Sequence, residues 1–223
     1  NLFRKAIVDE GFERLQKLVR NRIGKYEGRQ RKVDDLCFVY MKEEQVVLVN
    51  NQDEKVGLMD KQMAHETGGL HRAVSVFIFN QNGELLLQKR ASSKYHGAGL
   101  WTNTCCTHPR DGETNEACAH RRLKEEMGFD TELKESFSFI YKSEVENGLV
   151  EHEFDHVFFG VYNAEINPNL NEVEDFTFVS LGNVSKDADQ HPERFSIWFR
   201  IILEKFKEHL SGMEHTLQKA VGV

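Results

Sequence analysis

Residues 113–129 constrain the fold of this chain more than any other segment. They predict a helix from Glu113 to Met127, which Asp111-Gly112 can cap and which Gly128 can end. Within the helix, a pair of arginines is followed four residues later by a pair of glutamates. Acidic residues on a helix usually form a solvated face, but carboxylates clustered at a helix end also suit a hard cation such as Mg²⁺, which takes oxygen ligands and bridges to phosphates.

Strands and helices interleave along the rest of the chain. Because they do so without a regular βαβ repeat, the pattern predicts an α/β (α+β) fold, with a mixed β-sheet flanked by helices. The segment from Gly97 to Pro109 is rich in glycine and small polar residues and reads as a loop. The other expected elements are strands at 46–49, 74–79, 85–87, 137–141, 154–162 and 176–179, and a final helix at 197–210.

Residues 1–40 differ from the rest of the chain. Apolar residues recur there at helical spacing, and a basic stretch from Gly28 to Lys32 comes next. From Met41 the chain reads like a protein start that runs into a strand. We therefore expect residues 1–40 to be a helical appendage and residues 41–223 to form one domain. A packed N-terminal helix fits the pattern equally well.

The charge and composition of the chain limit the kinds of partner that it can bind. Net charge is −7, with ten Lys and Arg against six Asp and Glu in residues 1–40, so the remainder carries −11. An acidic body argues against nucleic acid as the main partner, because binding to a phosphate backbone needs dense positive charge. No apolar run approaches the roughly 18–20 residues of a membrane span. Two of the four cysteines are adjacent, a poor disulfide framework, so we expect a cytoplasmic protein, a monomer or homodimer.

The helix segment resembles the Nudix box, whose pattern is G-x5-E-x7-R-E-U-x-E-E-x-G-U with U aliphatic. Glu113, Arg121, the glutamate pair and Gly128 match it. Two positions depart, because Thr107 replaces the opening glycine and Arg122 replaces the glutamate that follows the arginine. A guanidinium in place of a carboxylate should weaken metal-activated hydrolysis and favour holding a phosphate. We expect a Nudix-like fold without the hydrolase chemistry.

Three other motifs resemble the type I isopentenyl-diphosphate isomerases, a branch of the Nudix superfamily. They are residues 70–77 (LHRAVSVF), 101–109 (WTNTCCTHP) and 151–153 (EHE). The resemblance runs from about Met41 to the final helix and implies interconversion of isopentenyl and dimethylallyl diphosphate in isoprenoid biosynthesis. Two alternatives stay open. A Nudix pyrophosphohydrolase of a small diphosphate is opposed by Arg122, and a non-catalytic metal-binding module would not depend on a catalytic thiol or carboxylate.

The resemblance implies a metal site. Its ligands would be His65, His71, His108, Glu151 and Glu153. Glutamates two apart on a strand project to the same face, so both can point at one centre. A set of three imidazoles and two carboxylates suits a borderline transition metal such as Mn²⁺ or Zn²⁺. It does not match a zinc site built from soft thiolates as well. The remaining histidines, His96 among them, are expected to be ordinary.

Resemblance also assigns the catalytic residues. Cys106 would handle a proton on one side of the alkene and Glu153 on the other, with Tyr141 as the partner of the glutamate. Trp198 matches an aromatic residue near the hydrocarbon tail, where a π-face can stabilise a carbocation by about 0.5–2 kcal/mol. The competing interpretations are a buried small hydrophobic residue for Cys106 and core packing for Trp198.

The diphosphate tail would be held by cations and a second metal ion. The family positions that match are Lys61, Arg90, Lys94 and Arg122, and Glu126 would bind the diphosphate through Mg²⁺. Any single lysine or arginine is normally a solvated surface charge. Gripping the tail fixes the alkene between Cys106 and Glu153, where positioning can lower the barrier.

Overall fold

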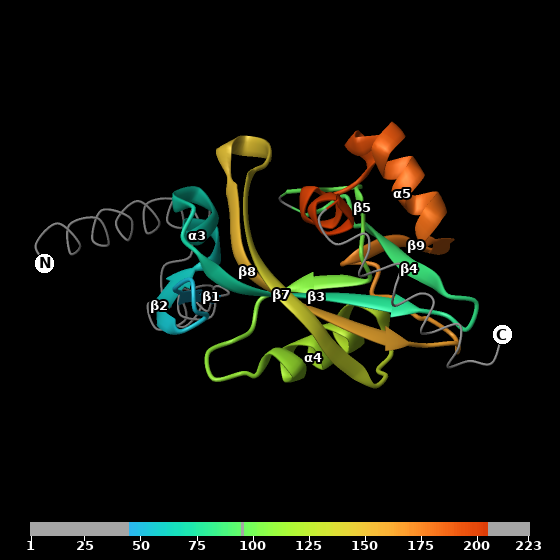
Figure 1. Cartoon of the computed structure of the whole chain (residues 1–223), viewed down its shortest axis with the longest axis horizontal. Coiled ribbons are helices and arrows are strands. Elements are labelled where there is room, and N and C mark those ends of the chain that lie inside the picture. The colour runs from blue at the N-terminus through green and yellow to red at the C-terminus, as the bar shows by residue number, and fades with distance from the viewer. Residues whose placement is uncertain (1–44, 95, 205–223) are drawn as a thin grey trace, which may run out of the picture. The chain divides into compact units, whose positions relative to one another are not determined.

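A computed structural model of the chain describes residues 45–94 and 96–204, and its sheet is organised around strand β3 (His71–Phe79), as Figure 1 shows. β3 pairs in parallel with β8 (Val150–Val161) over nine residues. It also pairs antiparallel with β1 (Gln45–Val49), β4 (Glu84–Arg90) and β6 (Cys105–Thr107). Parallel and antiparallel partners on one strand make the sheet mixed, as the sequence predicts.

The remaining strands extend this sheet in several directions. β2 (Lys55–Asp60) pairs with β1, and β7 (Leu133–Glu144) pairs with β8, both antiparallel. β5 (Trp101–Thr102) and β9 (Val173–Ser180) both pair antiparallel with β4. The expected strands at 46–49, 74–79, 85–87, 137–141 and 176–179 lie within observed strands, and the expected strand at 154–162 passes the end of β8 by one residue.

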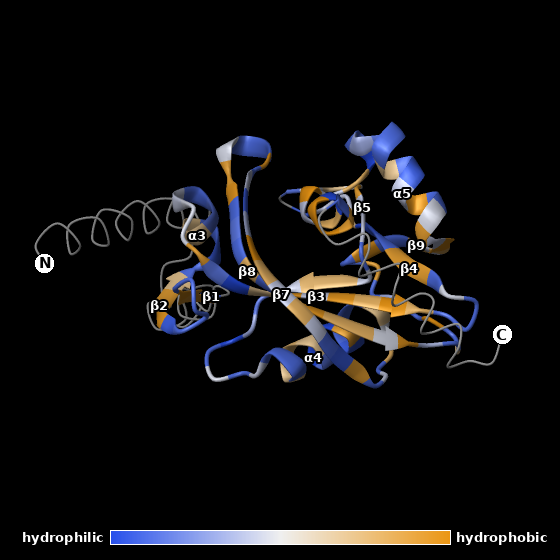
Figure 2. Cartoon of the chain, viewed as in Figure 1, coloured by the Kyte–Doolittle hydropathy of each residue, from blue (hydrophilic) through white to orange (hydrophobic). Residues whose placement is uncertain are grey.

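Alternate residues of β3 enter two separate cores, because successive side chains of a strand point to opposite faces. Phe77 packs on the face covered by α5 (Leu181–Gln190) and by helical residues 197–204. Val76 packs on the other face, against α4 (Asn115–Met127). The orange run along β3 in Figure 2 reflects this burial on both sides. The predicted Nudix-like arrangement, a mixed sheet flanked by helices, is thus confirmed.

Short helical segments complete the described chain. α3 (Lys61–Thr67) begins after Asp60, whose side chain accepts from the Met63 amide, and ends at Gly68 in the left-handed region. The 3₁₀ turn η1 (Glu146–Gly148) joins β7 to β8, and η2 (Pro192–Arg194) follows α5. None of these three elements, nor α5, was predicted from the sequence.

Two boundaries expected from sequence are wrong. α4 begins at Asn115 rather than at Glu113, because the hydroxyl of Thr114 accepts the Ala117 amide at 3.1 Å and caps the helix in place of Asp111-Gly112. The expected loop 97–109 contains β5 and β6, whose small polar residues pair with neighbouring strands. Gly128 does end α4, with φ +77.

Some expectations lie outside the described residues. These are the helical appendage at 1–40 and the end of the helix predicted at 197–210. Within the ranges that the structure describes, no helix is long and apolar enough to cross a membrane.

The entry to α4 is held by one ion pair. Arg121 donates from Nε to Glu113 Oε1 at 2.6 Å and from Nη2 to Glu113 Oε2 at 2.8 Å. Both side chains are mostly buried, with 14% and 18% exposed. The hydrogen bonds from Arg121 lower the pKa of Glu113 below its usual value. The first glutamate of the box therefore anchors the loop before α4 to the helix.

This ion pair predicts a pH dependence. Because the pKa of Glu113 is lower in the folded state, its stabilisation is present above the usual glutamate pKa of about 4.3 and is lost as pH falls through the folded value. Glu113→Gln should reduce the free energy of unfolding by about 1–3 kcal/mol at pH 7, and the difference from wild type should shrink toward pH 3. Urea unfolding at several pH values measures this.

The matched control is Asp187→Asn, which breaks the exposed pair of Asp187 with Arg194. Such a pair is worth about 0–1 kcal/mol. If Glu113→Gln changes stability no more than this control at pH 7, the anchoring role is wrong.

A second prediction concerns Gly128. A Cβ there would lie 2.1 Å from the main-chain oxygen of Asn167, at a φ of +77. Gly128→Ala should lower the free energy of unfolding by about 3 kcal/mol, through backbone strain and this overlap. Gly112→Ala has the same φ, but no described atom lies within 4 Å of its Cβ, so about 1 kcal/mol is expected. Equal losses in the two variants would contradict the role of the close approach.

Candidate active site

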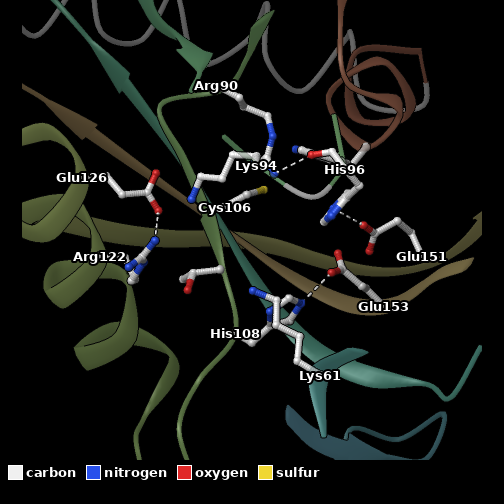
Figure 3. Close-up of a pocket in the computed structure, with 12 residues that line it drawn as sticks. Lys61, Arg90, Lys94, His96, Cys106, His108, Arg122, Glu126, Glu151 and Glu153 are labelled. Atoms are coloured by element: carbon white, nitrogen blue, oxygen red, sulfur yellow. Dashed lines mark hydrogen bonds and ion pairs between the residues drawn. The ribbon is translucent and has the colours of Figure 1, made fainter. Parts of the chain in front are cut away.

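A cavity gathers side chains from distant parts of the described chain. Figure 3 shows them converging from α3, the ends of β4 and β6, α4, β8 and the helix at 197–204. The lining residues are Lys61, Arg90, Lys94, His96, Cys106, Thr107, His108, Arg122, Glu126, Glu151, Glu153 and Trp198. Three other residues named from sequence, His65, His71 and Tyr141, are buried and contact residues of the lining.

The register of the strands that pair with β3 determines which side chains reach the cavity. In the parallel pairing of β3 with β8, His71 lies opposite Glu153. In the antiparallel pairing of β3 with β6, Ser75 lies opposite Cys106. A thiol on one neighbour of β3 and a carboxylate on the other therefore reach the same cavity. His108 follows β6 directly and comes to the same place.

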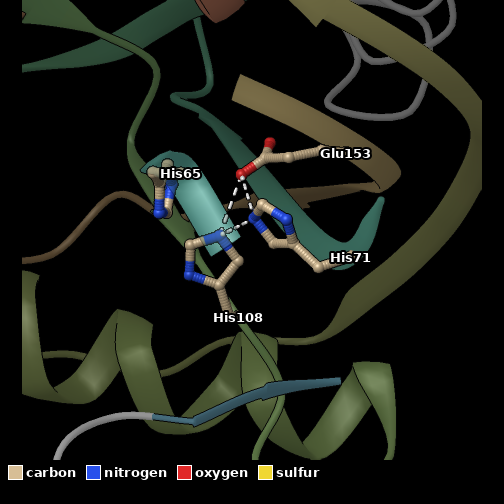
Figure 4. A group of neighbouring side chains, drawn as sticks. All are labelled: His65, His71, His108 and Glu153. Atoms are coloured by element: carbon tan, nitrogen blue, oxygen red, sulfur yellow. Dashed lines mark hydrogen bonds and ion pairs between the residues drawn. The ribbon is translucent and has the colours of Figure 1, made fainter. Parts of the chain in front are cut away.

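Four side chains form a compact group, shown in Figure 4: His65, His71, His108 and Glu153. One ligand atom from each lies within 4.8 Å of the others. His65 donates Nδ1–H to the Lys61 carbonyl at 2.6 Å, and His71 donates Nδ1–H to the Gly69 carbonyl at 2.8 Å. Each ring then presents Nε2 as an acceptor, the tautomer that binds a metal.

The charge state of His108 agrees with metal binding. Burial lowers the pKa of His108 to about 4, so the ring is neutral at pH 7. Its Nε2 lies 3.2 Å from Nε2 of His71 and 2.8 Å from Oε1 of Glu153. At His65, burial lowers the pKa, but the contact with Glu151 outweighs burial and raises it. Imidazole nitrogens and a carboxylate oxygen that converge on one point fit a divalent metal ion.

Glu151 lies beside this group rather than within it. Its Oε2 is 3.2 Å from Nε2 of His65, and its Oε1 is 2.9 Å from Nε2 of His96. Glu151 and Glu153 share one face of β8, as expected for residues two apart. Their carboxylates nevertheless contact different histidines.

The thiol of Cys106 lies in a polar contact network. Ser75 Oγ is 3.0 Å from the sulfur and donates to Asp155 Oδ2 at 2.7 Å. Burial raises the pKa of the Cys106 thiol well above its usual value, and the carboxylates of Asp155 and Glu153 add to this. Cys106 is therefore a neutral thiol that holds a proton.

The carboxylate of Glu153 has the opposite character. Burial alone would raise its pKa, but the adjacent imidazoles of His108 and His71 outweigh burial and hold the pKa well below its usual value. Tyr141 donates its hydroxyl to Glu153 Oε2 at 2.6 Å. Burial, with Glu153 next, raises the pKa of Tyr141 well above its usual value, so the tyrosine keeps its proton. The cavity thus places a protonated thiol and an ionised carboxylate in its wall.

Cations gather on the side of the cavity nearer α4. Arg122 contacts Glu126 at 2.5 Å and Glu172 at 3.4 Å, and Lys94 also pairs with Glu172. Glu126 is buried and accepts from the Gln88 amide at 2.8 Å. Positive groups beside a buried carboxylate can hold an anion together with a cation.

Arg90 joins this cationic side to the aromatic wall. Its guanidinium lies 5.0 Å from the ring centroid of Trp198 and donates to the carbonyls of His96 and Gly97. Trp198 itself is buried and belongs to the core around Phe77. Its ring serves both as core and as cavity wall, so the two interpretations of Trp198 are compatible.

Sequence reasoning missed four residues of this site. Ser75 interrupts the apolar run of β3, and Asp155 continues the alternation of Glu151 and Glu153 along β8, so both gave a usable signal. His96 and Glu172 lie in irregular segments, and their partners lie 50 or more positions away in the sequence. No spacing rule connects them to the site.

The chain has relatives among characterised proteins. A NUDIX domain family model matches residues 69–199. The protein "Isopentenyl-diphosphate Delta-isomerase 2" of Aromatoleum aromaticum is 48% identical, over 73% of this chain and 86% of its own length. A protein of the same name from Photorhabdus laumondii is 50% identical, over 72% of this chain and 91% of its own length.

A solved structure supports the fold alone. DR0079 from Deinococcus radiodurans is 21% identical, with a TM-score of 0.56 over 66% of this chain and 90% of that chain. The isomerase relatives agree with the resemblance carried by the WTNTCCTHP and EHE motifs. The chain belongs to the NUDIX domain family and, within it, to the isopentenyl-diphosphate Delta-isomerases.

Proposed function

We propose that this isomerase interconverts isopentenyl and dimethylallyl diphosphate with Cys106 and Glu153 as its two proton-handling groups. The observation that carries the proposal is that both side chains line one cavity, where the Cys106 thiol holds a proton and the Glu153 carboxylate has none. Isomerisation adds a proton to the terminal alkene carbon and removes one two carbons away. It therefore needs one group that holds a proton and one that lacks it, and nothing is oxidised or reduced.

The reaction is demanding because an unactivated alkene is a very weak base. The thiol of Cys106 would donate the proton, and the carboxylate of Glu153 would accept the proton that leaves. Tyr141 would stabilise that carboxylate before transfer and keep it oriented. The tertiary carbocation between these steps must be kept from water, and the Trp198 ring in the wall could stabilise it by about 0.5–2 kcal/mol.

The diphosphate would bind at the cationic side. Arg90, Lys94 and Arg122 would contact its oxygens there, and Lys61, which lines the cavity beside His108, would contact them as well. Glu126 would hold Mg²⁺ against the same oxygens, and its burial beside Arg122 suits this. Arg122 stands where hydrolases of the family carry a glutamate, which favours binding the tail over cleaving it.

The second ion would be held by His65, His71, His108, Glu151 and Glu153. Imidazole and carboxylate ligands favour Mn²⁺ or Zn²⁺ at such a site. When bound, this ion supplies positive charge that stabilises the buried carboxylates and fixes their orientation. The side chains of the protein, rather than this ion, would contact the substrate and transfer the protons.

We also propose a compartment, a domain division and an assembly for the enzyme. Cys105, Cys106 and Cys118 are free thiols in the described part of the chain, which supports a reducing cytoplasm. We also retain residues 41–223 as the isomerase domain, residues 1–40 as an appendage, and a monomer or homodimer without nucleic acid as the assembly.

Two substitutions test the proton-handling groups. Cys106→Ala and Glu153→Gln should each abolish formation of dimethylallyl diphosphate, by at least about 10²–10⁴-fold, because each removes one proton transfer. Turnover of isopentenyl diphosphate is followed by NMR, with phosphate release measured in parallel to detect hydrolysis. Thermal unfolding checks that the variants fold.

Cys105→Ala is the matched control, because Cys105 is the adjacent, fully buried cysteine, packed in the core beneath α4. It should keep most of the turnover. Near wild-type turnover in Cys106→Ala would contradict the mechanism, and phosphate release in place of isomerisation would favour a pyrophosphohydrolase.

Metal removal should stop turnover. A strong chelator followed by desalting is expected to inactivate the enzyme, because the buried carboxylates and neutral imidazoles lose the charge that organises them. Mg²⁺ alone should not restore turnover, whereas Mg²⁺ with Mn²⁺ or Zn²⁺ should. Elemental analysis checks that the stripped protein holds no metal. Full turnover in that protein would contradict the proposed need for metal ions.

A further inference from the structure

His96 contacts Glu151, Trp198 and Arg90, and Figure 3 shows its ring directed at Glu151. We propose that His96 is a positioning residue that fixes Glu151 as a ligand of the histidine metal site. The inference rests on the proposed metal site and adds a residue to it. The observation that carries it is that a ring nitrogen of His96 contacts one oxygen of Glu151, while a ring nitrogen of His65 contacts the other.

The two oxygens of Glu151 have different environments. Oε1 lies 2.9 Å from Nε2 of His96, and Oε2 lies 3.2 Å from Nε2 of His65. Glu151 is only 2% exposed and His96 only 8%, so water contributes little to either contact. A buried carboxylate needs partners for both oxygens, since an uncompensated one is strongly unfavourable.

The tautomer of His65 decides which contact is a hydrogen bond. In its neutral form, the form that binds a metal, His65 donates Nδ1–H to the Lys61 carbonyl and has no proton on Nε2 to give to Glu151. The Oε2 of Glu151 and Nε2 of His65 then face each other as two acceptors, an arrangement that a shared cation resolves. His96 is left to donate Nε2–H to Oε1.

This arrangement is the usual one around metal ligands. A ligating carboxylate commonly accepts a hydrogen bond on the oxygen that does not face the ion, and loss of such a partner costs 10–100-fold in metal affinity or activity. His96 fits this position rather than that of a ligand, because its Nε2 contacts Oε1 of Glu151, the oxygen that does not contact His65.

The backbone around His96 is held firmly enough for such a role. Its carbonyl accepts from Arg90 Nη2 at 3.0 Å. Its ring lies edge-on to Trp198, with centroids 5.8 Å apart. Gly97 follows with φ +58, and a Cβ there would press on Arg90 and Trp198 at 3.2 and 3.3 Å. The loop therefore fixes the direction of the imidazole and links metal occupancy to the substrate wall.

The test is the affinity of metal-stripped protein for Mn²⁺, read from the EPR signal of free aqueous Mn²⁺. We expect His96→Ala to bind Mn²⁺ about 10–100-fold more weakly than wild type. His96→Gln places an amide N–H near the position of Nε2 and should recover most of that affinity. Turnover of His96→Ala should return toward wild type at saturating Mn²⁺, because the residue acts through the metal site.

Two controls frame the result. His191→Ala makes the same change at a side chain that is 53% exposed, and it should leave Mn²⁺ affinity unchanged. His71→Ala removes a proposed ligand and should weaken binding more than His96→Ala does. Thermal unfolding of the metal-stripped variants identifies any that fail to fold, and His96→Gln then carries the test.

The outcomes separate the two proposals. Wild-type affinity in His96→Ala, together with weak binding in His71→Ala, would overturn the inference about His96 and leave the metal site standing. Equal weakness of His96→Gln and His96→Ala in folded protein would also overturn it, because the ring would then act as a ligand. Failure of the wild type to bind either Mn²⁺ or Zn²⁺ would overturn the proposed site itself.

Discussion

The parallel pairing of β3 with β8 is the constraint on which the site depends. It aligns His71 with Glu153 and continues to Phe79 opposite Val161, so one register sets both the metal group and the core. A shift by one residue would turn Glu151, Glu153 and Asp155 to the other face of the sheet. Burial of β3 on both faces fixes that register, because every shift would expose apolar side chains and bury charged ones.

The cavity divides its charges along its length. On one side, buried carboxylates of β8 face neutral or hydrogen-bonded imidazoles, an arrangement that suits a metal ion. On the other side, arginine and lysine surround Glu126, an arrangement that suits a diphosphate. Buried charge is tolerated only where partners compensate it. Cys106 lies at the boundary and adds a neutral, proton-bearing group between the two halves.

Local sequence patterns predicted the elements that local interactions determine. The mixed sheet and the end of α4 at Gly128 followed from the interleaving of strand and helix patterns and from a glycine stop. The start of α4 was misplaced because Asp111-Gly112 and Thr114 can each cap a helix; in the structure Thr114 caps it and Asp111 contacts Lys55. The strands β5 and β6 were missed because they exist only through pairing with distant strands.

The candidate site divides in the same way. Residues within the family motifs, such as Cys106 and Glu153, could be named from sequence, and the structure brings them to one cavity while their roles stay predictions. Glu151 was expected to face the same centre as Glu153, yet its carboxylate contacts His65 and His96. His96 and Glu172 could not be found from sequence, because each acts through a partner that is distant along the chain.

The central geometric claim is that the alkene lies between the thiol and the carboxylate. A crystal structure of the Mg²⁺- and Mn²⁺-loaded protein with an unreactive analogue of isopentenyl diphosphate measures it directly. We predict Cys106 Sγ and Glu153 Oε on opposite sides of the hydrocarbon, each about 3–3.5 Å from its carbon, with the diphosphate on the cationic side. Both groups on one side of the hydrocarbon, or a tail that points into solvent, would contradict the claim.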